Sequence, residues 1–160
     1  MGIRADIRDE LKKESVTKIH GQPKSHDLTI LEKELIAILA GIPTALGGGN
    51  FGHVGVIMEA AAYATMTGGI AFTDPANPGV YPAGLAANAA ATVRARAEAE
   101  HKELITQFET FEGVRQGVKD LILEAVDNEY LIEIEHETLG YLNQTPRQML
   151  QHLLTRGGSL

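Results

Sequence analysis

The segment from residue 47 to residue 55 sets the strongest limit on how this chain can fold. Glycine occupies five of its nine positions: Gly47, Gly48, Gly49, Gly52 and Gly55. Glycine loses more backbone freedom on folding than any other residue, so this density is unfavourable for a regular helix or strand. We expect an irregular structural loop here, followed by a short extended or helical piece over Val54–Met58.

The glycine segment lies within a long stretch that carries almost no charge. From Leu35 to Val93 there is no Lys or Arg, and the only acidic residues are Glu59 and Asp74. The cores of protein interfaces are depleted in charged residues, so we expect this stretch to supply a contact surface. The candidates for self-association are Phe51, His53, Val56, Met58, Tyr63, Met66, Pro78 and Tyr81.

Helical patterns precede this uncharged stretch, overlap its first residues and occur once more within it. Thr29 and Glu32 have the spacing of a capping box. Four apolar residues that follow Thr29 share one helix face: Leu31, Leu35, Ile38 and Leu39. Gly41 and Pro43 end this helix. Residues 5–14 predict a frayed helix, and residues 59–66 predict a short one.

The chain after residue 85 also reads as helical. Apolar residues recur at three- and four-residue spacings up to Val126, as one long helix or as two that meet near Gly113. Thr145, Pro146 and Gln148 are typical of an N-cap, a first turn and a third helical position, so a last helix starts there.

An acidic segment separates these helices. Asp127 is placed to cap a helix on which three carboxylates would stack at four-residue spacing: Glu129, Glu133 and Glu137. Such a face is usually solvated. The functional interpretation is an acidic docking surface for a basic patch on another copy or another protein.

The chain of 160 residues has the size of one domain. We predict a mainly α fold of about five or six helices, with an irregular Gly/Pro-rich middle segment. Residues 1–26 are expected to form a polar N-terminal arm, and residues 27–158 a single helical domain.

Two motifs bear on a binding or catalytic role. Gly47, Gly49 and Gly52 match the dinucleotide fingerprint, but Pro43 lies where the preceding strand would be, and no later strands are predicted. His53 would either act as a catalytic base or hydrogen-bond loop carbonyls and fix the loop, and we favour the second role. A small nucleotide-binding or enzymatic module that uses Gly47–His53 remains an alternative.

Metal and nucleic-acid chemistry have weaker sequence support. Glu98-x-x-His101 and Glu133-x-x-His136 have the spacing found in di-iron bundles, but only 35 positions separate them, which leaves no room for an intervening ligand helix. The sequence contains no Cys, and its net charge of −7 is unfavourable for a surface that grips nucleic acid. We expect no catalytic residue, metal or cofactor.

Three passages together resemble a known family. They are residues 42–58, residues 72–84 and residues 139–154. In order and spacing they resemble the capsid-like Gag region of Copia-type LTR retrotransposons, in the divergent form found in algae and other protists. The resemblance spans roughly residues 25–158. It implies a structural protein that self-assembles into a shell or oligomer around retroelement RNA.

The sequence departs from that family at two points. We expect the second helical assembly region of that family to be absent, and without Cys the sequence lacks the zinc knuckle that often binds RNA. The resemblance therefore implies the first capsid domain alone, a homo-oligomer that meets RNA through other parts of a longer polyprotein. We expect a cytoplasmic protein without a membrane or small-molecule partner. A domesticated adaptor domain with an acidic docking face is a further alternative.

Overall fold

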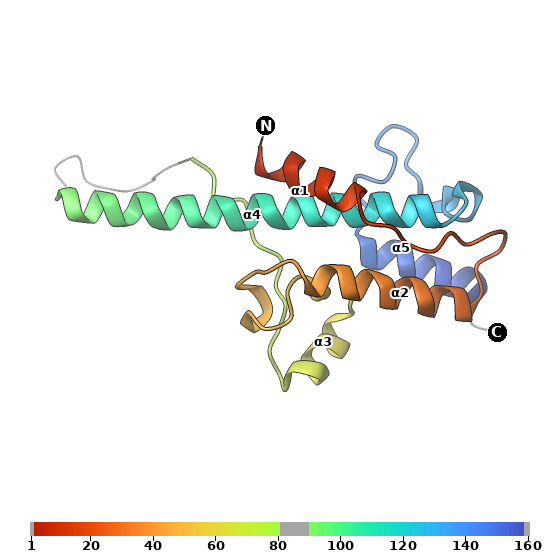
Figure 1. The fold of residues 1–160 in the computed structure, drawn as a ribbon. Helices are drawn as coiled ribbons and strands as arrows, with labels where there is room; N and C mark the ends of the chain where they lie inside the picture. The colour runs from red at the N-terminus through yellow and green to blue at the C-terminus, as the bar shows by residue number, and fades with distance from the viewer. Residues whose placement is uncertain (1, 81–89, 159–160) are drawn as a thin grey trace.

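The computed structural model describes residues 2–80 and 90–158, and helices dominate this part of the chain (Figure 1). Its α-helices are α1 (Ile3–Lys12), α2 (Ser25–Ala40), α3 (Ala60–Thr67), α4 (Ala91–Ala125) and α5 (Pro146–Leu153). Its short helical turns are η1 (Leu46–Gly48), η2 (Val54–Val56), η3 (Asn128–Tyr130), η4 (Ile132–Ile134) and η5 (Leu154–Gly158). The prediction of a mainly α fold with an irregular middle is confirmed.

Helix α4 is the axis of the fold. It runs unbroken for 35 residues, so the choice between one helix and two is settled in favour of one. In Figure 1, α1 lies along one side of it, while α2 and α5 lie together on another. The buried side chains of its C-terminal half join those of α2 and α5 in one core that includes Leu35, Leu39, Val118, Ile122 and Met149.

The two glycines inside α4, Gly113 and Gly117, lie against α1. A Cβ atom on Gly113 would lie 2.7 Å from the carbonyl oxygen of Arg4, and one on Gly117 would lie 2.4 Å from Cδ1 of Leu11. Glycine costs a helix interior about 1 kcal/mol relative to alanine. Here the two glycines accept that cost because the absence of a side chain lets α1 approach the backbone of α4 closely.

Two ion pairs join α1 to α4. Arg4 Nη2 lies 2.6 Å from Glu109 Oε2, and Arg8 Nε lies 2.6 Å from Asp120 Oδ2. Residues 1–26 were expected to form a polar arm, but α1 packs on α4 and the segment buries Leu11, Ile19 and Pro23. The polar residues of α1 hid this packing from sequence reasoning because several of them pair with α4.

Helix α2 begins four residues before the expected capping box. The backbone N–H of Lys24 donates to Asp27 Oδ2 at 3.1 Å, so the Asp27 carboxylate stabilises the N-terminus of the helix. The Thr29 hydroxyl, already inside the helix, donates to the carbonyl of Ser25 at 2.9 Å. The prediction that Thr29 caps this helix is therefore wrong, because the competing carboxylate of Asp27 lies two residues before Thr29, beside the apolar Leu28.

The acidic segment does not form the expected α-helix. It forms the two short turns η3 and η4, followed by an isolated bridge between His136 and Gly140. Asp127 does not cap a helix with its side chain and instead pairs with Lys18, 3.1 Å away. Leu131 is the one residue of this segment that is fully buried, which gives a helix little apolar surface to pack.

Candidate functional site

The glycine segment wraps around the C-terminal end of α2. Gly47, Gly48, Gly49 and Gly52 all have positive φ angles, which glycine adopts without strain. Gly52 also lies against backbone, because a Cβ there would be 2.5 Å from the carbonyl oxygen of Leu39. The irregular loop predicted from glycine density is confirmed, and its backbone is packed against this chain's own helix.

His53 closes the end of α2. Its backbone N–H donates to the carbonyl of Leu39 at 2.9 Å, and its ring Nδ1 donates to the carbonyl of Ile42 at 2.7 Å. The first bond satisfies a carbonyl of the last turn of α2, where a helix leaves carbonyls without intrahelical partners, and the second satisfies a carbonyl two residues beyond the helix. His53 thus fixes the loop, as favoured from the sequence, and its side chain is fully buried.

Tyr63 of α3 holds the other side of the loop. Its hydroxyl donates to the carbonyl of Gly47 at 2.6 Å, and its ring makes edge contacts with Phe51 and Phe72. A Cβ on Gly55 would lie 2.1 Å from the Phe72 ring, so this glycine makes room for the aromatic cluster. Aromatic pairs of this geometry contribute about 0.5–1.5 kcal/mol beyond burial.

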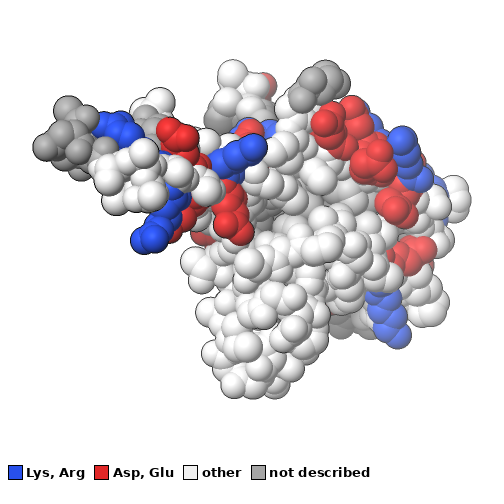
Figure 2. Space-filling view, turned by 60° about the vertical axis from the view of Figure 1, so that its left-hand side comes forward, with Lys and Arg blue, Asp and Glu red and all other residues white. Residues whose placement is uncertain are grey.

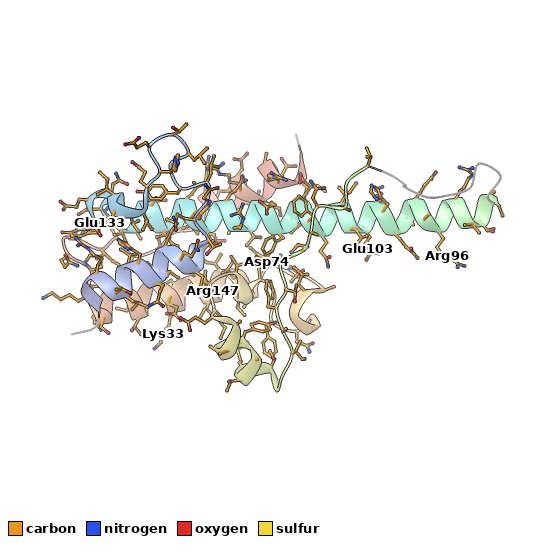
Figure 3. The ribbon with its side chains drawn as sticks, turned by 180° about the vertical axis from the view of Figure 1, so that it is seen from behind. Lys33, Asp74, Arg96, Glu103, Glu133 and Arg147 are labelled. Atoms are coloured by element: carbon orange, nitrogen blue, oxygen red, sulfur yellow. The ribbon has the colours of Figure 1, made fainter. Side chains whose placement is uncertain are left out.

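Arg147 connects the loop to α5, and sequence reasoning did not single it out. Its guanidinium donates to the carbonyl of Gly55, and Figure 3 shows α5 beside the segment that contains the loop. Asp74 and Arg115 line the same small cavity as Arg147. The capping signal at Thr145 fixed the start of α5, but the contact needs the tertiary packing of residues far apart in sequence.

The space around the glycine backbone bears on a phosphate-binding role. In a dinucleotide loop the backbone must be open to the pyrophosphate. The Tyr63 hydroxyl lies 2.1 Å from the position that a Cβ on Gly47 would occupy, and the last carbonyls of α2 crowd Gly52. This arrangement suits a structural loop better than a cradle for phosphate.

Lys119 is a buried cation in α4 that the sequence did not mark. It is 6% exposed, and its Nζ donates to the carbonyl of Tyr141 at 2.9 Å. Burial lowers its pKa below the ordinary value, and the nearby Arg115 lowers it further. The bond ties the chain after η4 to the long helix, which is a structural role.

Burial divides the candidates for self-association into groups. His53, Val56 and Tyr63 lie in the core and present no surface to a partner, so naming them as contact residues was wrong. Phe51, Met58 and Pro78 are half-buried, and Met66 is exposed. Tyr81 lies outside the described residues. Apolar side chains near the loop serve first to fill the core, which composition alone does not reveal.

The candidates that stay accessible lie near a neutral lobe, which we define as residues 46–52 and 60–73. It contains no charged residue. Figure 2 shows this lower part of the molecule free of the charged side chains that cover other regions. Met66 and Ile70 are 43% and 41% exposed on it. Ile70 was not among the candidates predicted from the sequence. Its exposure depends on where the chain runs after α3, which no sequence pattern indicates.

The three acidic docking candidates are exposed, but they share no helix face. Glu129 lies in η3, Glu133 in η4, and Glu137 follows the bridge residue His136. Glu133 Oε1 lies 2.7 Å from Arg156 Nη1, so this carboxylate already pairs within the chain. The acidic stack expected from the sequence is not present.

The two Glu-x-x-His motifs lie at different ends of the molecule. Glu98 and His101 belong to the N-terminal half of α4, whereas Glu133 and His136 come after its C-terminal end. Within residues 2–80 and 90–158, no three His, Asp or Glu side chains gather in a way that would hold a metal ion. Nor does any helix in this part have the length and apolar character needed to cross a membrane.

Acid is expected to destabilise the protein through His53. Burial lowers the pKa of His53 below its usual 6.5, although its bond to the Ile42 carbonyl raises the pKa in part. Below the unfolded pKa, the unfolded chain therefore binds the proton more readily than the folded chain. The stability from neutral His53 is complete above about pH 6.5 and declines as the pH falls toward the lower folded value.

Urea unfolding between about pH 7.5 and about pH 5.5 tests this. In His53→Asn the amide nitrogen can still donate to the Ile42 carbonyl, but the side chain does not titrate. The variant should lose less stability than the natural protein across this range. Equal losses in the two proteins would contradict the assignment.

Comparison of the chain with protein-family models, with curated proteins and with solved structures found no match.

Proposed function

We propose that this chain is a structural, self-associating protein: a capsid-like Gag region whose copies assemble into a shell or oligomer around retroelement RNA. The resemblance of residues 42–58, 72–84 and 139–154 to Copia-type Gag supports this role. A helical domain of this kind is compatible with it. In this function the glycine loop is scaffolding, and no residue of the chain carries out a reaction.

The observation that carries this function is the neutral lobe. Its exposed apolar side chains Met66 and Ile70 lie among residues without any charge. Exposed apolar patches on folded proteins often mark interaction sites, and interface cores are depleted in charge. The lobe is therefore the first surface through which copies would meet, and it replaces the buried candidates His53, Val56 and Tyr63 in that role.

The RNA contact belongs to other parts of a longer polyprotein. The chain carries a net charge of −7, so its own surface as a whole repels a phosphate backbone. Assembly would concentrate many copies around one RNA, and any basic segment joined to each copy would then act together with the others.

Self-association should make the mass in solution rise with protein concentration. Introducing two carboxylates into the lobe, as Met66→Asp with Ile70→Asp, should raise the dissociation constant at least about tenfold, because each charge would be desolvated at the interface. Ile132→Asp is the matched control, since Ile132 is 56% exposed in η4, outside the lobe. Sedimentation equilibrium measures all three proteins.

Electron micrographs with and without added RNA complete the test. Closed shells or regular arrays would support the capsid role. A natural protein that stays monomeric at high concentration, with or without RNA, would refute self-association altogether. If Ile132→Asp weakens association as much as the lobe variant does, the lobe is not the contact surface.

A further inference from the structure

The N-terminal half of α4 extends beyond α1, α2, α3 and α5 (Figure 1). We call residues 91–107 the helix arm. Val93 and Leu104 on this arm are 47% and 53% exposed. Helices in proteins gain most of their stability from packing an apolar face, so a long projecting helix with exposed apolar side chains lacks part of that support.

The arm carries the pattern of a short coiled-coil seam. Val93, Ala97, Glu100 and Leu104 follow one another at spacings of four, three and four residues. Residues at this spacing share one face of a helix and form the a and d positions of a heptad. The seam therefore has an apolar residue at each end, with a small residue and a carboxylate between them.

Two opposite charges flank this seam on the same side. Arg96 and Glu103 are seven residues apart, which is two helical turns, and Figure 3 shows both on one side of the arm. Both side chains are exposed. Neither makes an ion pair with another residue in the part of the chain that the structure describes.

This pattern is complementary to itself when two arms run in opposite directions. In one such alignment, Val93 of the first copy packs on Leu104 of the second. The twofold axis between the arms then repeats the contact, so that Leu104 of the first copy packs on Val93 of the second. It brings each Glu100 opposite Ala97 of the other copy. It also places each Arg96, at the flank of the seam, within two residues (about 3 Å along the axis) of Glu103 of the other copy. A parallel alignment in register would instead set Glu100 against Glu100, and like charges facing each other are unfavourable.

We propose that the helix arms of two copies of this chain pair antiparallel, with Val93 packed on Leu104 and Arg96 paired with Glu103. This rests on the proposed self-association and names a second contact surface, separate from the neutral lobe. A chain with two distinct contact surfaces can join more than two copies, which a shell requires.

Charge reversal tests the pairing. Arg96→Glu places two carboxylates against each other in the paired arms, and Glu103→Arg places two guanidinium groups there. Each variant alone should lose arm pairing, with a dissociation constant raised at least about tenfold. An equimolar mixture of the two should recover pairing as a heterodimer, because the carboxylate introduced at position 96 of one variant then meets the guanidinium introduced at position 103 of the other. Native mass spectrometry and sedimentation distinguish these species.

The experiment uses the full chain that also carries Met66→Asp and Ile70→Asp, so that association through the lobe does not obscure the result. Lys102→Glu is the matched control, because Lys102 is exposed on the arm and lies two residues from both Glu100 and Leu104, which places it on the opposite face of the helix. It should pair like the parent protein. Single variants that pair as well as the parent, or a mixture without heterodimer, would overturn the arm pairing.

These outcomes separate the inference from the proposed function. A natural protein that assembles normally while Arg96→Glu changes nothing would retain the function and remove the arm from it. A natural protein that never associates would remove both.

Discussion

Gly52→Ala is expected to lower the free energy of unfolding by about 3 kcal/mol or more. Gly52 has a φ of 56°, a left-handed conformation that costs an L-residue about 1–2 kcal/mol. The added Cβ would also lie 2.5, 2.7 and 2.9 Å from the carbonyl oxygens of Leu39, Ala40 and Ile42. These are backbone atoms, and His53 is bonded to two of them, so they cannot move aside without disrupting the end of α2.

Gly68→Ala is the control for Gly52→Ala. Gly68 has a comparable φ of 75°, but no atom lies within 4 Å of the position where its Cβ would be. Its substitution should therefore cost only the backbone strain, about 1–2 kcal/mol. Urea unfolding of the two variants measures the difference. If both lose the same stability, close packing at Gly52 does not hold the loop.

Removal of the Tyr63 side chain should have an effect of similar size. Tyr63 is fully buried between Phe51 and Phe72, and truncating a buried aromatic residue to alanine costs about 3–5 kcal/mol. Tyr63→Phe keeps the ring but leaves the carbonyl of Gly47 without its donor. That smaller change should cost about 1–3 kcal/mol.

Thermal or urea unfolding of both Tyr63 variants separates packing from hydrogen bonding. Near-ultraviolet circular dichroism should change for Tyr63→Ala, because the aromatic cluster around the loop loses its central ring. A Tyr63→Ala protein that is as stable as Tyr63→Phe would show that α3 does not hold the glycine loop. In that case the contacts of Tyr63 with Gly47, Phe51 and Phe72 would not be what holds the neutral lobe together.

Elements with a local start signal were predictable from the sequence. At α5, the Thr145 hydroxyl accepts from the backbone N–H of Gln148 at 3.0 Å, and the Gln148 side chain accepts from the N–H of Thr145 at 2.8 Å. Both hydrogen bonds join residues that are three positions apart in the sequence. The local sequence pattern is therefore sufficient to predict where α5 begins. At α2, Thr29 offered the same kind of signal but Asp27 offered a competing one, and packing of the buried Leu28 favours the earlier start.

The candidate site was less predictable because it depends on which neutral residues are enclosed. His53 and Met66 both belong to the uncharged stretch, yet one is fully buried and the other is exposed. The hydrogen bonds of His53 to carbonyls at the end of α2 explain why His53 is buried. Met66 stays exposed because no helix covers it in the part of the chain that the structure describes. Composition identifies the stretch, but only tertiary contacts sort its members.

The continuity of α4 also makes it a mechanical lever. Phe111 marks the point where the helix enters the core, and Ala91 at the other end lies 20 residues away, about 30 Å along the axis. A rotation of about 5° in the core would shift the far end by about 3 Å over that length. Substitutions that repack the core can therefore change the spacing between copies joined through the arm, although they touch no residue of the contact.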